Sequence, residues 1–169
     1  MKKIFFSLFL LSLLSTTSCN NDDDNGPTNP IDQLPPETQT GENTFGFLLN
    51  GEPINVTNTN EQVAIYQGGG LQFGAGGVYI VVLEPFTTNT NYNFMNLGEG
   101  NSRARFTLET SDDVFCLYEY NDTYQGSVIF TNIDQTNFIV SGTFEFSTIN
   151  DDCENINITN GRFDLQYIP

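Results

Sequence analysis

Residues 138–147 read Phe-Ile-Val-Ser-Gly-Thr-Phe-Glu-Phe-Ser, and this stretch decides the fold. Phe138, Val140, Phe144 and Phe146 lie on one face of an extended chain, and mostly polar or small residues lie on the other. Side chains of a β-strand point alternately to its two faces, so this pattern predicts a strand with one buried face.

The segment that follows predicts the partner of this strand. Asn150-Asp151-Asp152 supplies turn residues between the two strands. The apolar positions are even up to Ile158 and odd from Phe163 onward. One extra residue near Gly161, as in a β-bulge, would return the apolar side chains to the same face. We therefore expect a bulge there, with Gly161 at a positive φ.

The same alternation predicts short strands along the whole domain, separated by clusters of Gly, Asn and Asp. Asn50-Gly51 is a strong signal for a tight hairpin. About ten strands with no long helical period predict an all-β domain, first an antiparallel β-sandwich and second a lipocalin-like β-barrel. The predicted strands are 44–49, 54–56, 63–66, 71–73, 78–83, 92–97, 103–109, 114–120, 127–133, 138–147 and 156–167.

The N-terminal residues predict export. Lys2 and Lys3 precede an apolar run over residues 4–14, and small residues lead to Cys19. This order is typical of a secretory signal, and the run is shorter than the roughly 20 residues that a membrane span requires. Because the cleavage region resembles a lipobox, we expect residues 1–18 to be a lipoprotein signal peptide and Cys19 to carry lipid.

Residues 19–42 are polar, acidic and contain proline, so they predict a disordered tether before a single β domain over residues 43–169. The acidic run Asp22, Asp23 and Asp24 resembles the export signal of surface lipoproteins in the Bacteroidota. That resemblance implies an outer-membrane protein displayed on the cell surface, with the lipid as its contact with the membrane.

Composition excludes several functions. The chain has 21 acidic residues and no histidine, and both of its lysines lie in the signal. Nucleic-acid binding requires a basic surface, and histidine- or lysine-dependent catalysis requires residues that the mature chain lacks. We therefore predict no catalytic residues, no metal site and no cofactor. Carboxylate-only hydrolysis and calcium binding by clustered acids are the chemistries that composition leaves open.

Cys116 and Cys153 are the cysteines that remain once Cys19 is lipidated. An even pair in an oxidising compartment can form a disulfide, which the loop-entropy model values at about 4 kcal/mol. Two buried free thiols are the alternative, and the spacing does not choose between them.

Tyrosines and arginines are the candidate ligand-binding residues. Tyr118, Tyr120 and Tyr124 cluster in sequence, and exposed aromatic rings stack on sugars. Arg103 and Arg105 lie two residues apart on one strand face, where they can bind an anionic ligand or pair with neighbouring acids.

Three C-terminal segments resemble the closing part of an uncharacterised family of small Bacteroidota surface lipoproteins. The front of the domain is similar too, through the hairpin at Asn50-Gly51. The resemblance implies a location on the cell surface and a β fold, and it assigns no functional residues. The matching segments are 34–46, 126–134, 140–146 and 158–164.

Together these features favour a non-catalytic surface module that binds a glycan or a protein partner. A lipocalin-like carrier of a small apolar ligand is the second hypothesis, and a carboxylate-only hydrolase is the third. A purely structural role is also open.

Protease treatment of intact cells tests the predicted location on the cell surface. Wild-type protein should be degraded from outside, and a variant with Asp22, Asp23 and Asp24 replaced by Ala should be protected, because the acidic run routes the protein to the outer face. Protection of the wild type, or unchanged exposure of the variant, would contradict the prediction.

Overall fold

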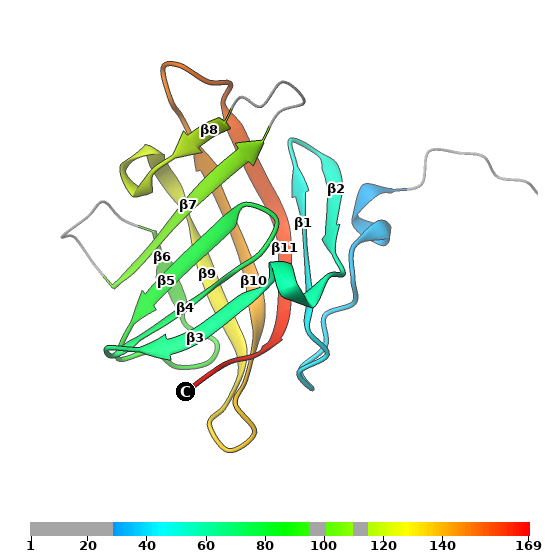
Figure 1. Ribbon diagram of the computed structural model, residues 1–169, viewed down its shortest axis with the longest axis vertical. Helices are drawn as coiled ribbons and strands as arrows, with labels where there is room; N and C mark the ends of the chain where they lie inside the picture. Colours follow the sequence, from blue (N-terminus) through cyan, green and yellow to red (C-terminus); the bar gives the residue numbers. More distant parts are fainter. Residues whose placement is uncertain (1–28, 95–100, 110–114) are drawn as a thin grey trace, which may run out of the picture.

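The computed structural model describes residues 29–94, 101–109 and 115–169. These residues form eleven β-strands, in two antiparallel sheets packed face to face, and three short 3-10 helices (Figure 1). The strands are β1 (Thr44–Leu49), β2 (Glu52–Val56), β3 (Val63–Gln67), β4 (Gly70–Gly74), β5 (Val78–Leu83), β6 (Asn91–Asn93), β7 (Ser102–Glu109), β8 (Phe115–Tyr118), β9 (Thr123–Asp134), β10 (Ile139–Thr148) and β11 (Ile156–Gln166). The 3-10 helices are η1 (Pro30–Gln33), η2 (Thr59–Glu61) and η3 (Tyr120–Asp122).

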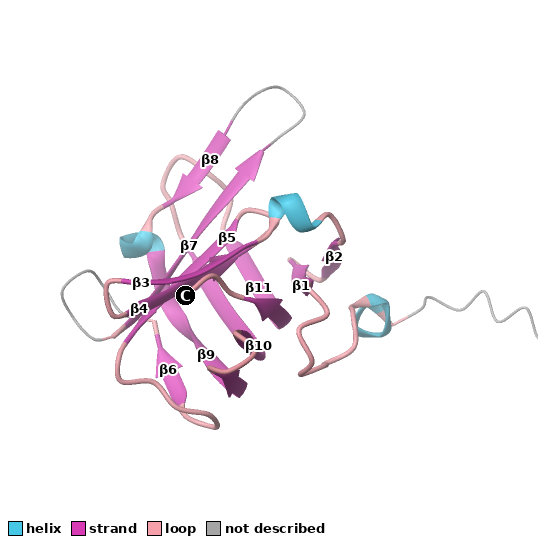
Figure 2. Cartoon of the chain, turned by 60° about the horizontal axis from the view of Figure 1, so that its bottom comes forward, coloured by secondary structure: helices cyan, strands magenta, loops and turns pink. Residues whose placement is uncertain are grey.

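The two sheets are separate, and this makes the fold a β-sandwich. The six-stranded sheet has the order β2-β1-β11-β10-β9-β6, and the five-stranded sheet has the order β3-β4-β5-β7-β8 (Figures 1 and 2). The predicted sandwich is therefore confirmed. The lipocalin-like barrel is wrong, because each sheet ends in edge strands and neither closes on itself.

Aromatic side chains from both sheets form the core. The ring of Phe163 lies 4.5 Å from that of Phe73 in the opposite sheet, and the ring of Phe144 lies 5.2 Å from that of Phe45. Tilted and edge-on ring contacts add to the large apolar area that each ring buries. This packing accounts for the alternation of apolar and polar residues along the strands.

The predicted tight hairpin is confirmed. Leu49 pairs with Glu52, so Asn50 and Gly51 alone make the turn, with φ values of 50° and 93°. Two positive φ values are what a type I′ turn requires, and Asn-Gly adopts them at low cost.

The predicted bulge is confirmed, but its conformation differs from the expectation. Phe144 pairs with Gly161 and Phe146 with Ile158, so two residues of β11 face one residue of β10. The positive φ of 53° is at Asn160, and Gly161 is not in the left-handed region. Gly161 provides space instead, because a Cβ at this position would lie 2.6 Å from the Phe144 ring.

Phe138 departs from the sequence prediction. It lies in the loop between β9 and β10 rather than on the buried face of β10. Its φ is 56° and its side chain is 41% exposed, so its expected place in the core is wrong. Phe138 belongs to the hairpin loop, and the alternation of buried and exposed side chains begins with β10 at Ile139.

The end of the chain joins the two sheets at one corner. Ile168, which follows β11, forms an isolated parallel bridge with Ile65 of β3. The Tyr66 N–H donates to the Ile168 carbonyl at 2.7 Å, and the Ile168 N–H donates to the Ala64 carbonyl at 2.9 Å. These bonds occupy part of the edge of β3.

Part of the predicted tether belongs to the folded domain. Residues 33–42 lie beside β1, β2 and β11 on the outer face of the six-stranded sheet (Figure 1). Leu34 is buried, and Arg162 of β11 donates a 3.1 Å hydrogen bond to the carbonyl of Pro35. The predicted boundary at residue 43 is therefore wrong, because the sheet binds this segment through side chains that the sequence pattern leaves unassigned.

Asp164 of β11 is the main attachment point for this segment. Its buried carboxylate accepts hydrogen bonds from the backbone N–H groups of Thr40, Gly41 and Glu42 at 3.0, 2.9 and 3.1 Å. The hydroxyl of Thr38 donates to it at 2.7 Å. On the sheet side, the hydroxyl of Ser141 also donates to Asp164 at 2.7 Å.

These hydrogen bonds determine the charge state of Asp164. Burial by itself raises the pKa of the carboxyl, but the donors from Ser141, Thr38, Glu42 and Gly41 outweigh it and hold the pKa below its ordinary value. The contribution to stability is therefore complete above the ordinary aspartate pKa of about 3.9, and it is lost as the pH falls through the lower folded-state pKa.

Replacing Asp164 with Asn should lower the free energy of unfolding by about 2–4 kcal/mol at pH 7. The amide removes the charge, and its NH2 group stands in place of one of the two oxygens that accept hydrogen bonds from five donors. Chemical denaturation of the purified protein measures this loss. The difference from wild type should shrink as the pH falls through the folded-state pKa of Asp164.

Asp32→Asn is the matched control, because this aspartate is exposed in η1 and its replacement should change stability by no more than about 0.5 kcal/mol. Equal stability of Asp164→Asn and wild type at pH 7 would contradict the assigned role of Asp164.

Candidate functional site

The outer face of the five-stranded sheet carries two arginines side by side. Arg103 and Arg105 alternate along β7 with the buried Ala104, so both side chains leave the core on the same face. On the neighbouring strand β5, Tyr79 pairs with Arg105 and Val81 pairs with Arg103. The predicted shared face of the two arginines is therefore confirmed.

Each guanidinium group packs on a tyrosine ring. The Cζ atom of Arg105 lies 4.7 Å from the ring centre of Tyr79, and that of Arg103 lies 4.8 Å from the ring centre of Tyr120. Arg105 also lies 5.7 Å from the ring centre of Tyr120. We call these four residues, Tyr79, Arg103, Arg105 and Tyr120, the Arg–Tyr cluster.

The two cations of the cluster lack acidic partners within the described part of the chain. There the one ion pair joins Arg162 to Glu37, with 3.7 Å between Nε and Oε1. The Nε atom of Arg103 is buried and has no hydrogen-bond partner among the described residues. The expected pairing of these arginines with neighbouring acids is thus not found in this part of the structure.

Tyr120 reaches the cluster because the chain leaves the strand before it. Tyr120 begins η3, where Asp122 accepts a 2.8 Å hydrogen bond from the backbone N–H of Glu119. This capped turn ends the alternation of β8, so Tyr120 lies on the face opposite to that of Tyr118. Burial raises the pKa of Tyr120, against the opposing effect of Arg105 and Arg103, and the phenol remains neutral at pH 7.

Tyr118 is not a ligand-binding residue, which corrects the sequence prediction. It is completely buried, its ring stacks on Phe106 at 6.0 Å, and its hydroxyl donates a 2.6 Å hydrogen bond to the Glu154 carbonyl. Burial raises the pKa of its phenol. The exposed face of β8 carries Phe115 and Leu117 instead, which are 61% and 45% exposed.

Tyr124 and Tyr79 also differ from the prediction. Tyr124 is 61% exposed on β9, but it makes no ring or cation contact with the four residues of the cluster. Tyr79 was missed by the sequence reasoning. Its one signal is its outward position in the otherwise apolar run of β5, where its hydroxyl donates to the side chain of Gln72.

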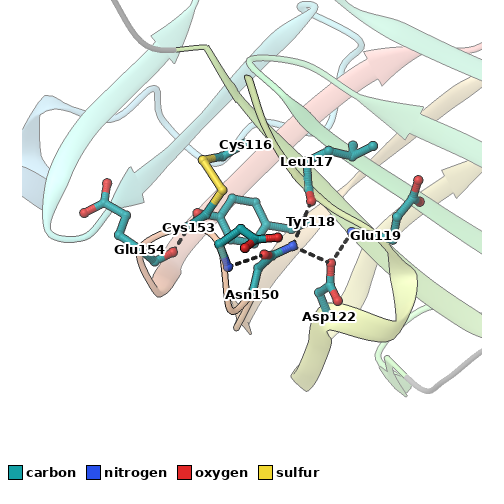
Figure 3. Close-up of a disulfide and its surroundings, with 9 residues drawn as sticks. Cys116, Leu117, Tyr118, Glu119, Asp122, Asn150, Cys153 and Glu154 are labelled. Atoms are coloured by element: carbon teal, nitrogen blue, oxygen red, sulfur yellow. Dashed lines mark hydrogen bonds between the residues drawn. A yellow bond between two sulfur atoms is a disulfide. The ribbon is translucent and has the colours of Figure 1, made fainter. Parts of the chain in front are cut away.

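A disulfide links Cys116 of β8 to Cys153 in the turn before β11, with 6.0 Å between the Cα atoms (Figure 3). The bond joins an edge of one sheet to a turn of the other, so it restrains the two layers. Asn150 supports the same junction, because its side-chain amide donates to the Leu117 carbonyl at 3.2 Å and to Asp122 at 3.3 Å. The disulfide thus lies close to the turn that positions Tyr120.

A shallow groove on the outer face of the six-stranded sheet has a volume of about 330 Å³. Glu37 and Glu145 are among its lining residues, and Arg162 lies beside them. The ion pair of Glu37 with Arg162 lies at this groove.

Some predicted functional residues lie outside the described part of the chain. They are Cys19, Asp22, Asp23 and Asp24. Among the described residues, no helix is long and apolar enough to span a membrane.

Comparison with protein families, with curated proteins and with solved structures finds no match for this chain.

Replacing Cys116 and Cys153 together with Ser should lower the free energy of unfolding by about 2–4 kcal/mol, because the unfolded chain gains freedom when the loop is opened. Denaturation curves of the oxidised protein measure the loss. Reductant should destabilise wild type to the level of the double variant and leave the variant unchanged. Equal stability of oxidised and reduced wild type would contradict the structural role of the bond.

Proposed function

We propose that this chain is a lipoprotein of the outer membrane, attached through lipidated Cys19 and displayed on the cell surface as a non-catalytic binding module. The signal sequence and the acidic run at Asp22, Asp23 and Asp24 support this location. The disulfide is consistent with it, because such bonds persist in exported proteins. The lack of histidine and of mature lysine supports a role in binding rather than catalysis.

The Arg–Tyr cluster is the observation that carries the binding role. Two of the three arginines of the chain lie next to each other there. Neither forms an ion pair with an acidic side chain among the described residues, although the chain has 21 acidic residues. Two adjacent like charges repel each other, so an anionic group that binds between them relieves an unfavourable interaction as well as adding a favourable one.

The geometry of the cluster suits a carboxylate. A guanidinium group that stacks on a tyrosine ring uses its flat face for that contact and keeps the N–H donors at its edge for a ligand. Those donors match the two oxygens of a carboxylate. The stacking also limits the freedom of both side chains before binding, which reduces the entropy that binding costs.

An acidic glycan is the ligand class that these features favour. Its carboxylate pairs with Arg103 or Arg105, and the apolar faces of its sugar rings contact the exposed apolar side chains that flank the cluster on β8. A short uronate oligosaccharide fits better than a long polyanion, because the many acids of the chain repel extended negative charge.

Titration of the purified protein with an oligogalacturonate, compared with a neutral cello-oligosaccharide, tests this proposal. The acidic sugar should bind and the neutral one should not. Arg103→Gln combined with Arg105→Gln should weaken binding by about tenfold or more, because charge-assisted hydrogen bonds contribute about 1.5–3 kcal/mol.

Arg162→Gln is the control, because it removes one positive charge from the six-stranded sheet, away from the cluster. Equal binding of the two sugars, equal losses in the two sets of variants, or no binding of either sugar would contradict an acidic-glycan site at the cluster.

A further inference from the structure

A second pocket, distinct from the Arg–Tyr cluster, lies at one end of the sandwich. It has a volume of about 260 Å³ and is formed by β3, β4, the segment after β5, the hairpin of β9 and β10, and the residues after β11. We call it the end pocket. Its lining residues are Tyr66, Leu71, Glu84, Phe86, Ile133, Gln135, Phe138, Val140, Tyr167 and Pro169.

Aromatic rings dominate the lining of the end pocket. Tyr66 and Phe86 form one edge-to-face pair, with ring centres 6.4 Å apart, and Phe138 and Tyr167 form another, with ring centres 5.8 Å apart. These pairs come from opposite sheets, so the pocket is a space with aromatic side chains on two sides. Leu71 and Val140 beneath them are buried core residues.

Phe138 has a conformation that the fold does not require of a phenylalanine. A bulky residue with a φ of 56° is strained by about 1–2 kcal/mol, and Asn or Gly would adopt this conformation more easily. Its side chain is also only partly buried, with 41% exposed. Asp134 fixes the loop that carries it by accepting hydrogen bonds from the N–H groups of Thr136 and Asn137 at 2.8 and 2.9 Å. The strained backbone at Phe138 thus holds an aromatic ring at the rim of the pocket.

The charges at the end pocket are negative. Glu84 lines it, and Asp134 is close enough to Tyr167 to affect the ionisation of its phenol. None of Arg103, Arg105 and Arg162 is among the lining residues. Interaction with the Glu84 carboxylate, followed by burial, raises the pKa of Tyr66. Burial raises the pKa of Tyr167 as well, so both rings remain neutral at pH 7.

From this arrangement we propose that the end pocket binds a small organic cation of the ammonium class, between the aromatic rings and beside Glu84. The faces of aromatic rings are electron-rich, and they attract a cation that has lost part of its water shell. The carboxylate supplies the opposite charge without needing to be fully buried. A volume of about 260 Å³ limits the ligand to a headgroup with a few carbon atoms, since pockets for drug-sized ligands measure roughly 300–1,000 Å³.

An NMR titration of the purified protein with choline tests this inference. Its neutral counterpart, 3,3-dimethyl-1-butanol, has the same shape and lacks the charge. Choline should shift the signals of Tyr66, Phe138 and Tyr167 in a saturable way, and the neutral alcohol should bind about tenfold more weakly or not at all.

Two variants separate charge from ring chemistry. Glu84→Gln keeps the shape of the side chain and removes the charge, and Phe138→Leu keeps an apolar side chain and removes the ring. Each should weaken choline binding by about tenfold, whereas Tyr124→Leu, which removes an exposed ring elsewhere on the domain, should leave it unchanged.

Equal affinity for choline and the alcohol, no saturable shift at the pocket, or retention of wild-type affinity by Glu84→Gln would overturn the inference. The end pocket shares no residue with the Arg–Tyr cluster, so the outcome is independent of the result with acidic sugars.

Discussion

The buried carboxylate of Asp164 is the constraint on which the arrangement of this domain depends. It accepts five hydrogen bonds, one from Ser141 within the sheet and four from residues 38–42. A charged group completely shielded from water is costly unless its oxygens are satisfied, so the segment and the carboxylate stabilise each other. The chain that leads from the N-terminus is thereby held on the outer face of the six-stranded sheet, beside β1 and β11.

This attachment divides the surface of the sandwich into parts with different roles. Residues 34–42 lie on part of the outer face of the six-stranded sheet, whereas the Arg–Tyr cluster lies on the outer face of the other sheet. The end pocket lies between the sheets. The disulfide of Cys116 and Cys153 holds the two layers together near Tyr120. We propose that this lipid-anchored domain has two ligand sites. The Arg–Tyr cluster binds carboxylates, and the end pocket binds ammonium groups.

The two-residue alternation of apolar side chains was sufficient to predict the strands, because burial of one face imposes it directly. β1 and β5 occur at the predicted residues, and the parity change before Phe163 correctly indicated a bulge. Phe138 was misplaced and the strand predicted over 114–120 was too long at its end, because turns interrupt the alternation and a sequence does not show which residue enters the turn. Tyr118 was misplaced because the alternation does not show which of the two faces of β8 is buried. The role of Asp164 could not be predicted either, because its partners lie more than 120 residues away in the chain, apart from Ser141.

Hydrogen exchange at the backbone amides of Gly41 and Glu42 tests most directly whether Asp164 holds this segment on the domain. Both amides donate to Asp164, and an amide that opens only when the domain unfolds exchanges with the free energy of global unfolding. We predict protection of both amides comparable to that of the paired amides of β10 and β11. Exchange at the rate of an unstructured peptide would contradict the account, because the segment would then be a free tether and Asp164 would lack its partners.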